Sequence, residues 1–291
     1  MCNELDFVTH FFNKKYGGYT MSSKLWEKDT FINENIFYLF NKEIIEYDMK
    51  EAGFSLIKEY HLIDDNTLNE LKKMGKEQRK IKIGKLQIKD DKLKSGLKES
   101  FKSARKRFFE ENDIKDDEVI SIKKDAIFVT KFCKTTKFGK HIDFRPKHEY
   151  SSYIRLDKKL EFYYSPIELS VKGIGDDKVQ LHYDYLIKFI NLYFKKMETS
   201  DNNDVILFLR HFIDKYKNRE LDVGFYRNFN SRSNFSVFND DNIYMEYWND
   251  DKDSLDISYN YFNILLKLIK LVTSSQAELE EVSSPLNIGF K

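Results

Sequence analysis

Residues 91–112 read DKLKSGLKESFKSARKRFFEEN and form the most regular pattern in the chain. Apolar residues recur there at intervals of three or four, which predicts a helix with one buried face. They are Leu93, Leu97, Phe101, Ala104 and Phe108. Basic residues with similar spacing share another face of that helix; they are Lys94, Lys98, Lys102, Arg105 and Lys106. The sequence therefore predicts a helix that packs on a core and presents positive charge on its other side.

This helix ends a strongly basic region in a chain whose total charge is close to zero. The whole chain has 49 Lys and Arg residues against 48 Asp and Glu, whereas the stretch from Lys72 to Arg107 holds fifteen basic and four acidic residues. Concentrated positive charge on a folded protein usually binds an anionic partner, although a solvated helix face is an equally simple explanation. We expect nucleic-acid phosphates to be the anion, and the predicted phosphate-binding residues are Arg79, Lys82, Lys85, Lys94, Lys98, Lys102 and Arg105.

The composition sets the class of protein. Aromatic residues make up 15% of the chain, which is too many for a disordered protein. Two cysteines, Cys2 and Cys133, are too few for a disulfide framework or a cysteine zinc site. The N-terminus lacks the basic and apolar regions of a signal peptide, and no apolar stretch is long enough to span a membrane. We therefore expect a soluble, cytoplasmic protein without a membrane partner.

The order of strand-like and helix-like segments predicts an α+β fold. Two hairpins are expected, one from residues 36–40 and 43–49, the other from residues 119–122 and 125–129. Further strands are expected at residues 148–156, 160–164 and 167–171. Other helices are expected at residues 54–62, 65–74, 179–197, 204–216 and 259–272. The expected parts are an N-terminal segment (1–34), an antiparallel-sheet core (35–175) with a basic helical insert at about 60–112, a helical region (176–272) and a flexible tail (273–291).

Two aspartates lie at strand ends inside the expected hairpins: Asp48 in the first and Asp125 in the second. Aspartate is a poor strand former, and an apolar run penalises its charge unless the charge is used. Carboxylates on adjacent strands could bind Mg²⁺ or Mn²⁺, because these hard cations prefer oxygen ligands and keep positions free for substrate phosphates. Aspartate is also common in turns, which is the simpler explanation. Glu46 and Glu51 are the candidates for a third ligand.

Residues 47–57 (YDMKEAGFSLI) resemble motif A of the palm domain of family B DNA polymerases, in which a strand delivers a metal-binding aspartate and turns into a helix. Residues 121–129 (SIKKDAIFV) resemble motif C of that family, a hairpin that carries the other metal-binding aspartate. The resemblance implies a palm-like core, fingers-like basic helices and a thumb-like helical C-terminal region, in a protein of phage or mobile-element type. It implies Asp48 and Asp125 as catalytic ligands of Mg²⁺ (or Mn²⁺). The implied partners are nucleoside triphosphates and a nucleic acid, DNA rather than RNA.

The implied activity is that of a DNA polymerase or primase, a nucleotidyltransferase in which a 3′-hydroxyl attacks an α-phosphate. Motif C of the family carries two aspartates, and Lys123 and Lys124 stand where the first would be. The alternative is therefore a catalytically inactive palm-like phage protein, which acts as a replication accessory factor or as an inhibitor of a host nuclease or defence complex. A third possibility is a nucleic-acid-binding α+β domain that uses the basic helix alone.

Overall fold

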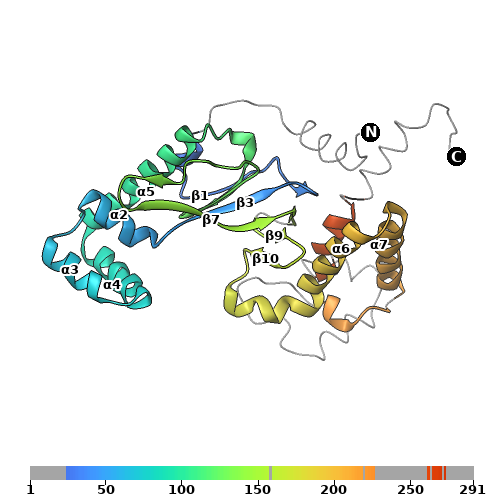
Figure 1. Cartoon of the computed structure of the whole chain (residues 1–291). Helices are drawn as coiled ribbons and strands as arrows, with labels where there is room; N and C mark the ends of the chain where they lie inside the picture. Colours follow the sequence, from blue (N-terminus) through green and yellow to red (C-terminus); the bar gives the residue numbers. More distant parts are fainter. Residues whose placement is uncertain are drawn as a thin grey trace. The chain divides into compact units, whose positions relative to one another are not determined.

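The computed structural model describes residues 24–156, 159–218 and 220–226, together with the helical residues 261, 262, 264–270 and 272. These residues form two compact units (Figure 1). The six-stranded unit comprises residues 24–36 and 42–150, and the four-stranded unit comprises residues 37–41 and the described residues from 151 onward. The α+β class predicted from the sequence is confirmed. Within the described ranges, no helix is both long and apolar enough to cross a membrane.

The six-stranded unit is built on an antiparallel sheet with the strand order β1-β4-β5-β3-β7-β6. Alternate residues of the central strand β3 (Ile45, Tyr47 and Met49) enter a core shared with helices, because side chains alternate across a strand. Helices α2 and α5 lie along this sheet (Figure 1). The strands are β1 (Thr30–Ile32), β3 (Ile44–Met49), β4 (Val119–Lys123), β5 (Ala126–Val129), β6 (Lys137–Phe138) and β7 (Ile142–Tyr150), and two 3₁₀ helices precede β1 and β4, η1 (Leu25–Glu27) and η2 (Asp116–Glu118).

Helix α5 (Asp91–Glu111) confirms the helix predicted for residues 91–112. Asp90 caps its N-terminus by accepting hydrogen bonds from two backbone N–H groups, those of Lys92 and Leu93. All five apolar residues of the predicted face are buried in the core of the six-stranded unit. The Phe108 ring centroid lies 4.7 Å from that of Phe144 and 5.2 Å from that of Tyr47. Helix α5 therefore supports both β7 and β3.

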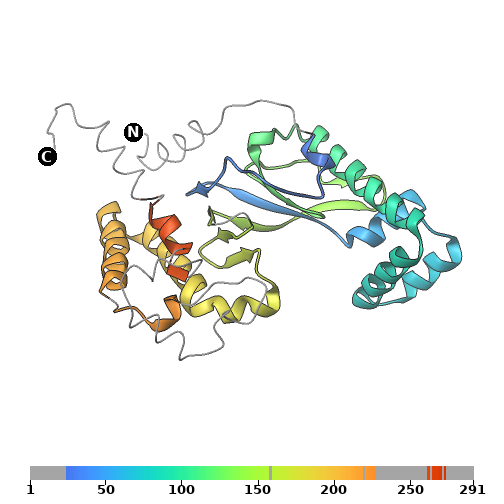
Figure 2. The ribbon, with the colours of Figure 1, turned by 180° about the vertical axis from the view of Figure 1, so that it is seen from behind.

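Three shorter helices connect β3 to α5. Helices α2 (Ala52–Tyr60) and α3 (Asp65–Lys73) correspond to the helices predicted at residues 54–62 and 65–74. Helix α4 (Lys76–Lys89) forms from the Lys-rich stretch, for which the sequence predicts no separate helix. It packs against α2 and α5, and Figure 2 shows α3 and α4, in cyan, as a helical hairpin at one end of the sheet.

The four-stranded unit has an antiparallel sheet with the order β10-β9-β8-β2, which shares a core with helices α6 and α7. The hydroxyls of Tyr38 and Tyr193 are hydrogen-bonded (3.1 Å), and the rings of Tyr164 and Phe194 stack with centroids 4.7 Å apart. The elements of this unit are β2 (Tyr38–Leu39), β8 (Ser152–Arg155), β9 (Glu161–Tyr164), β10 (Leu169–Lys172), the 3₁₀ helix η3 (Asp176–His182), the π-helix η4 (Tyr183–Ile187), α6 (Lys188–Thr199), α7 (Asn202–Lys217) and the 3₁₀ helix η5 (Val223–Tyr226).

Two predictions about strand pairing are wrong. Residues 36–40 and 43–49 do not form a hairpin, because β2 pairs with β8 in one sheet while β3 pairs with β5 and β7 in the other. The single strand predicted for residues 148–156 is divided at Ser151 between β7 and β8. Strands β2 and β3 are buried almost throughout, so their apolar pattern does not specify which sheet each one joins.

The boundary between the parts of the chain also differs from the prediction. The sequence places residues 35–175 in one core, whereas β8, β9 and β10 belong with the C-terminal helices because they share one apolar core. The hairpin predicted at residues 119–129 is confirmed as β4 and β5. The predicted tail at 273–291 and residues 1–23 lie outside the described residues.

Candidate active site

The β4–β5 hairpin brings the two predicted aspartates together. Asp48 lies near the end of β3 and pairs with Ala126 of β5, and Asp125 immediately precedes Ala126 in the hairpin turn. The backbone N–H of Met49 donates a hydrogen bond to the carbonyl oxygen of Asp125 (2.9 Å). Two residues that are far apart in the sequence are therefore neighbours at the same end of two adjacent strands.

The pKa of Asp48 is raised above its ordinary value. Burial is the main cause because it disfavours the charged carboxylate, and the negative charges of Asp125 and Glu46 add to the effect. Lys147 and Arg145 act in the opposite direction. Within the described part of the chain, neither Asp48 nor Asp125 makes a side-chain hydrogen bond or an ion pair. Both carboxylates are partly exposed, so they are available to a cation.

Arg145 and Lys147 are not among the residues that the sequence predicted for this site. Arg145 pairs with Asp48, and Lys147 is the extra residue at a register shift between β3 and β7. The sequence predicts a strand only from residue 148, whereas β7 begins at Ile142 and runs through Pro146, which has no N–H group for the ladder. Proline is tolerated at bulges, which is where Pro146 lies.

Neither candidate for a third ligand joins the two aspartates. Glu46 is 2% exposed; it accepts a hydrogen bond from the Tyr150 hydroxyl (3.0 Å) and lies 3.4 Å from Lys147 Nζ. Glu51 forms an ion pair with Arg79 (2.8 Å). Among the described residues, no group of three or more His, Cys, Asp and Glu side chains is placed to hold a metal ion. The chain thus offers a pair of carboxylates, a donor set that suits Mg²⁺ when substrate phosphates supply further oxygens.

The tip of the hairpin is attached to α5 by Arg105. Its guanidinium donates to the carbonyl oxygens of Trp26 and Lys124 and to Asp29 Oδ1, each at 2.9 Å. The side chain has no exposed surface, and burial lowers its pKa while Asp29 raises it. The prediction that Arg105 binds nucleic-acid phosphate is therefore wrong, because a buried and fully engaged guanidinium does not reach a ligand.

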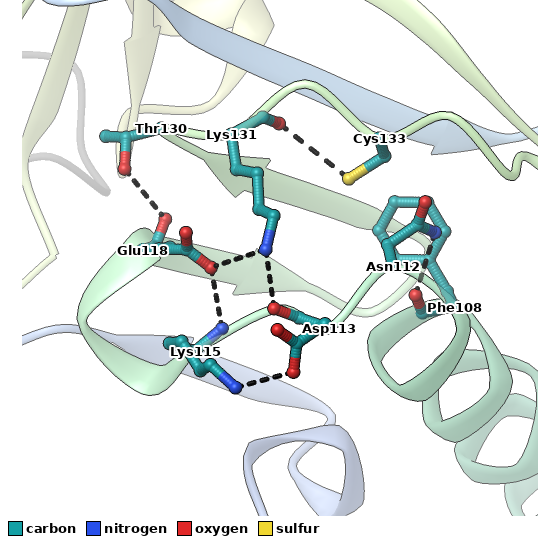
Figure 3. A network of polar contacts seen from close by, with 8 residues as sticks. All are labelled: Phe108, Asn112, Asp113, Lys115, Glu118, Thr130, Lys131 and Cys133. Carbon is teal, nitrogen blue, oxygen red and sulfur yellow. Dashed lines mark hydrogen bonds and ion pairs between the residues drawn. The ribbon is translucent and has the colours of Figure 1, made fainter.

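The chain after β5 is attached to the segment that follows α5 (Figure 3). Asn112, the residue after α5, donates to the Thr135 carbonyl oxygen (2.7 Å) and accepts from the Thr135 N–H (2.9 Å). Lys131, just after β5, donates to the carbonyl oxygen of Asp113 (2.6 Å) and lies 3.4 Å from Glu118 Oε2. The tip of the hairpin that carries Asp125 is thus bonded to α5, and the chain after β5 is bonded to the residues that follow α5.

Arg79, another predicted phosphate-binding residue, is also engaged within the protein. Its guanidinium pairs with Glu51 and donates to the carbonyl oxygens of Leu71 (3.1 Å) and Met74 (2.8 Å). It lies over the Phe54 ring, 4.1 Å from the centroid. These contacts join α2, α3 and α4, so Arg79 holds the helical insert together.

The predicted lysines differ in how free their charges are. Lys82 lies 3.9 Å from Glu70, and Lys102 forms an ion pair with Glu99 (2.8 Å). Three other lysines are exposed and form no ion pair within the residues that the structure describes: Lys85, Lys94 and Lys98. These three have the most available charge in the predicted set.

The chain matches a protein family. The family model described as Bacteriophage PBS1 gene 130 protein matches residues 21–274. No curated protein matches the chain.

Proposed function

The chain belongs to the Bacteriophage PBS1 gene 130 protein family, and we propose that this phage protein is a Mg²⁺-dependent nucleotidyltransferase of DNA polymerase or primase type. The observation that carries the proposal is the juxtaposition of Asp48 and Asp125 on adjacent strands, with neither carboxylate bonded to another described side chain. A half-buried carboxylate whose pKa is raised by burial and by a neighbouring carboxylate is unfavourable for folding, so the environment of Asp48 is typical of a functional site.

The proposed reaction joins the α-phosphate of a nucleoside triphosphate to a 3′-hydroxyl, and pyrophosphate leaves. Asp48 and Asp125 would hold Mg²⁺ (or Mn²⁺), which stabilises negative charge on the attacking and leaving oxygens. The rigid attachment of the hairpin to α5 would keep the two carboxylates in place, since displacement of a catalytic group by about 1 Å lowers the rate strongly. The order of β3, α2, α5 and the β4–β5 hairpin is similar to the order of motifs A and C with helices between them.

The exposed lysines of α4 and α5 support a nucleic acid as the partner. Lys85, Lys94 and Lys98 have no carboxylate partner among the described residues, so their charge is available to backbone phosphates. DNA is the proposed partner, with nucleoside triphosphates as the second substrate.

A second function is favoured by the basic residues around the aspartates. Lys123 and Lys124 stand where motif C of family B polymerases has its first aspartate. Lys147 and Arg145 already compensate part of the charge of Asp48. A protein with this site could bind nucleic acid or a protein partner without turnover. It would then act as a replication accessory factor or as an inhibitor of a host nuclease or defence complex.

Nucleotide incorporation separates the two functions. The full chain is incubated with Mg²⁺ or Mn²⁺, labelled deoxynucleoside triphosphates and single-stranded or primed DNA. Asp48→Asn and Asp125→Asn should each abolish incorporation while DNA binding persists. The control is Asp117→Asn, because Asp117 is exposed and lies before the same hairpin. Absence of incorporation by the wild-type protein on every template would refute the enzymatic function and favour the second one.

A further inference from the structure

Arg105 has the largest fully buried side chain among the described residues. A buried guanidinium is unfavourable unless its donors are satisfied and its charge is paired. Arg105 meets this condition through two carbonyl oxygens and the carboxylate of Asp29. An apolar residue of similar size at this helix position would avoid the desolvation penalty altogether. Packing alone therefore does not explain why an arginine occupies position 105.

One contact of Arg105 reaches the turn that precedes Asp125, and another reaches Asp29, whose backbone carbonyl is bonded to the same turn. Lys124 has φ 61°, in the left-handed region that residues other than glycine rarely adopt. The N–H of Lys124 donates to the backbone carbonyl oxygen of Asp29 (2.7 Å), and its carbonyl oxygen accepts from Arg105 Nη1. The backbone N–H and carbonyl oxygen of Lys124 are thus bound by Asp29 and by Arg105, which form an ion pair with each other.

We propose that Arg105 is a positioning residue, which with Asp29 holds the Lys124–Asp125 turn so that Asp125 stays beside Asp48. The inference rests on the proposed function, because it gives the turn a role in metal binding. The Asn112 and Lys131 contacts lie beyond the end of β5, whereas Arg105 provides the side-chain contact at the tip, next to the backbone bonds of Lys124 to Asp29 and of Met49 to Asp125. Without the guanidinium, the turn relaxes and the two carboxylates no longer share a fixed separation.

The test compares three substitutions in the full chain. Arg105→Lys keeps the positive charge but loses the fork of donors that reaches three acceptors at once. Asp29→Asn is a milder change, since the Asp29 side chain is 46% exposed and its backbone contact to Lys124 remains. Arg107→Met is the matched control, because Arg107 lies on the same helix, is 42% exposed and contacts Glu111 rather than the turn.

Two quantities are measured for each variant. The first is amide hydrogen exchange at Lys124 and Met49, whose N–H groups bond to the carbonyl oxygens of Asp29 and Asp125. The second is the affinity for Mn²⁺, obtained from the electron paramagnetic resonance signal of the free ion. Loss of hydrogen bonds to a charged group should speed exchange at both amides by roughly tenfold in Arg105→Lys and by less in Asp29→Asn. The affinity for Mn²⁺ should fall in the same order, and Arg107→Met should change neither quantity.

The outcomes are distinguishable. Unchanged exchange at Lys124 and Met49 in Arg105→Lys overturns the proposal, because the turn would then be held by other contacts. Faster exchange with unchanged Mn²⁺ affinity also overturns it, since Arg105 would then be purely structural. If wild type binds no Mn²⁺, the proposed function fails, and the exchange data alone show whether Arg105 holds the turn.

Discussion

Phe108→Ala should destabilise the six-stranded unit more than any exposed substitution of the same type. The Phe108 side chain has no exposed surface, and it packs against three rings from three strands: those of Tyr47, Phe138 and Phe144. Truncation of a buried phenylalanine leaves a cavity and costs about 3–5 kcal/mol. At a typical slope of about 2 kcal/mol per M, the midpoint of urea unfolding should fall by about 2 M.

The matched control is Phe132→Ala, because Phe132 is 62% exposed. Its effect should stay within about 0.5 kcal/mol. Tryptophan fluorescence in a Trp248→Phe background reports on Trp26, which lies in the six-stranded unit. Equal midpoints for the two variants would refute the conclusion that α5 packs on β3 and β7 through this residue.

Three further predictions concern the site and its surroundings. The pKa of Asp48 is raised, so its contribution to stability is largest at pH below the ordinary range of aspartate and is lost as pH rises through the raised value. Asp48→Asn should therefore unfold at a higher temperature than wild type at pH 7, with the difference vanishing at low pH; a lower unfolding temperature at pH 7 contradicts the assignment. Replacing Lys94 and Lys98 by glutamine should weaken binding to duplex DNA and reduce the salt slope of the affinity by roughly 0.9 per lost phosphate contact, measured by fluorescence anisotropy. An unchanged slope would place the DNA elsewhere. Gly139→Ala should cost about 1–3 kcal/mol in urea unfolding, because Gly139 has φ 73° and an added Cβ collides with the Glu59 carboxylate. An unchanged midpoint of urea unfolding would rule out the close approach of Gly139 to the Glu59 carboxylate.

Local patterns were sufficient for the elements that support the site. The spacing of apolar residues in 91–112 predicts α5 and its buried face, since helical periodicity reports which side chains share a direction. The two apolar runs around Lys123–Lys124 predict the β4–β5 hairpin, because a short turn leaves only one way to pair them. The two aspartates in apolar runs are the predicted site residues, and the structure places both at adjacent strand ends.

Periodicity does not report what covers a side chain, and Arg105 shows the consequence. Its spacing groups it with the lysines of the basic face, yet Trp26 and Asp29 supply two of its three acceptors and Lys124 supplies the third. The pairing of β2 with β8 likewise depends on contacts between distant residues. The apolar pattern of a single strand does not specify its partner strand. The amino-acid order thus specifies helices, turns and the positions of charged residues. The burial of a side chain and the identity of its bonding partner are decided only in the tertiary structure, because both depend on a second segment that packs against the first.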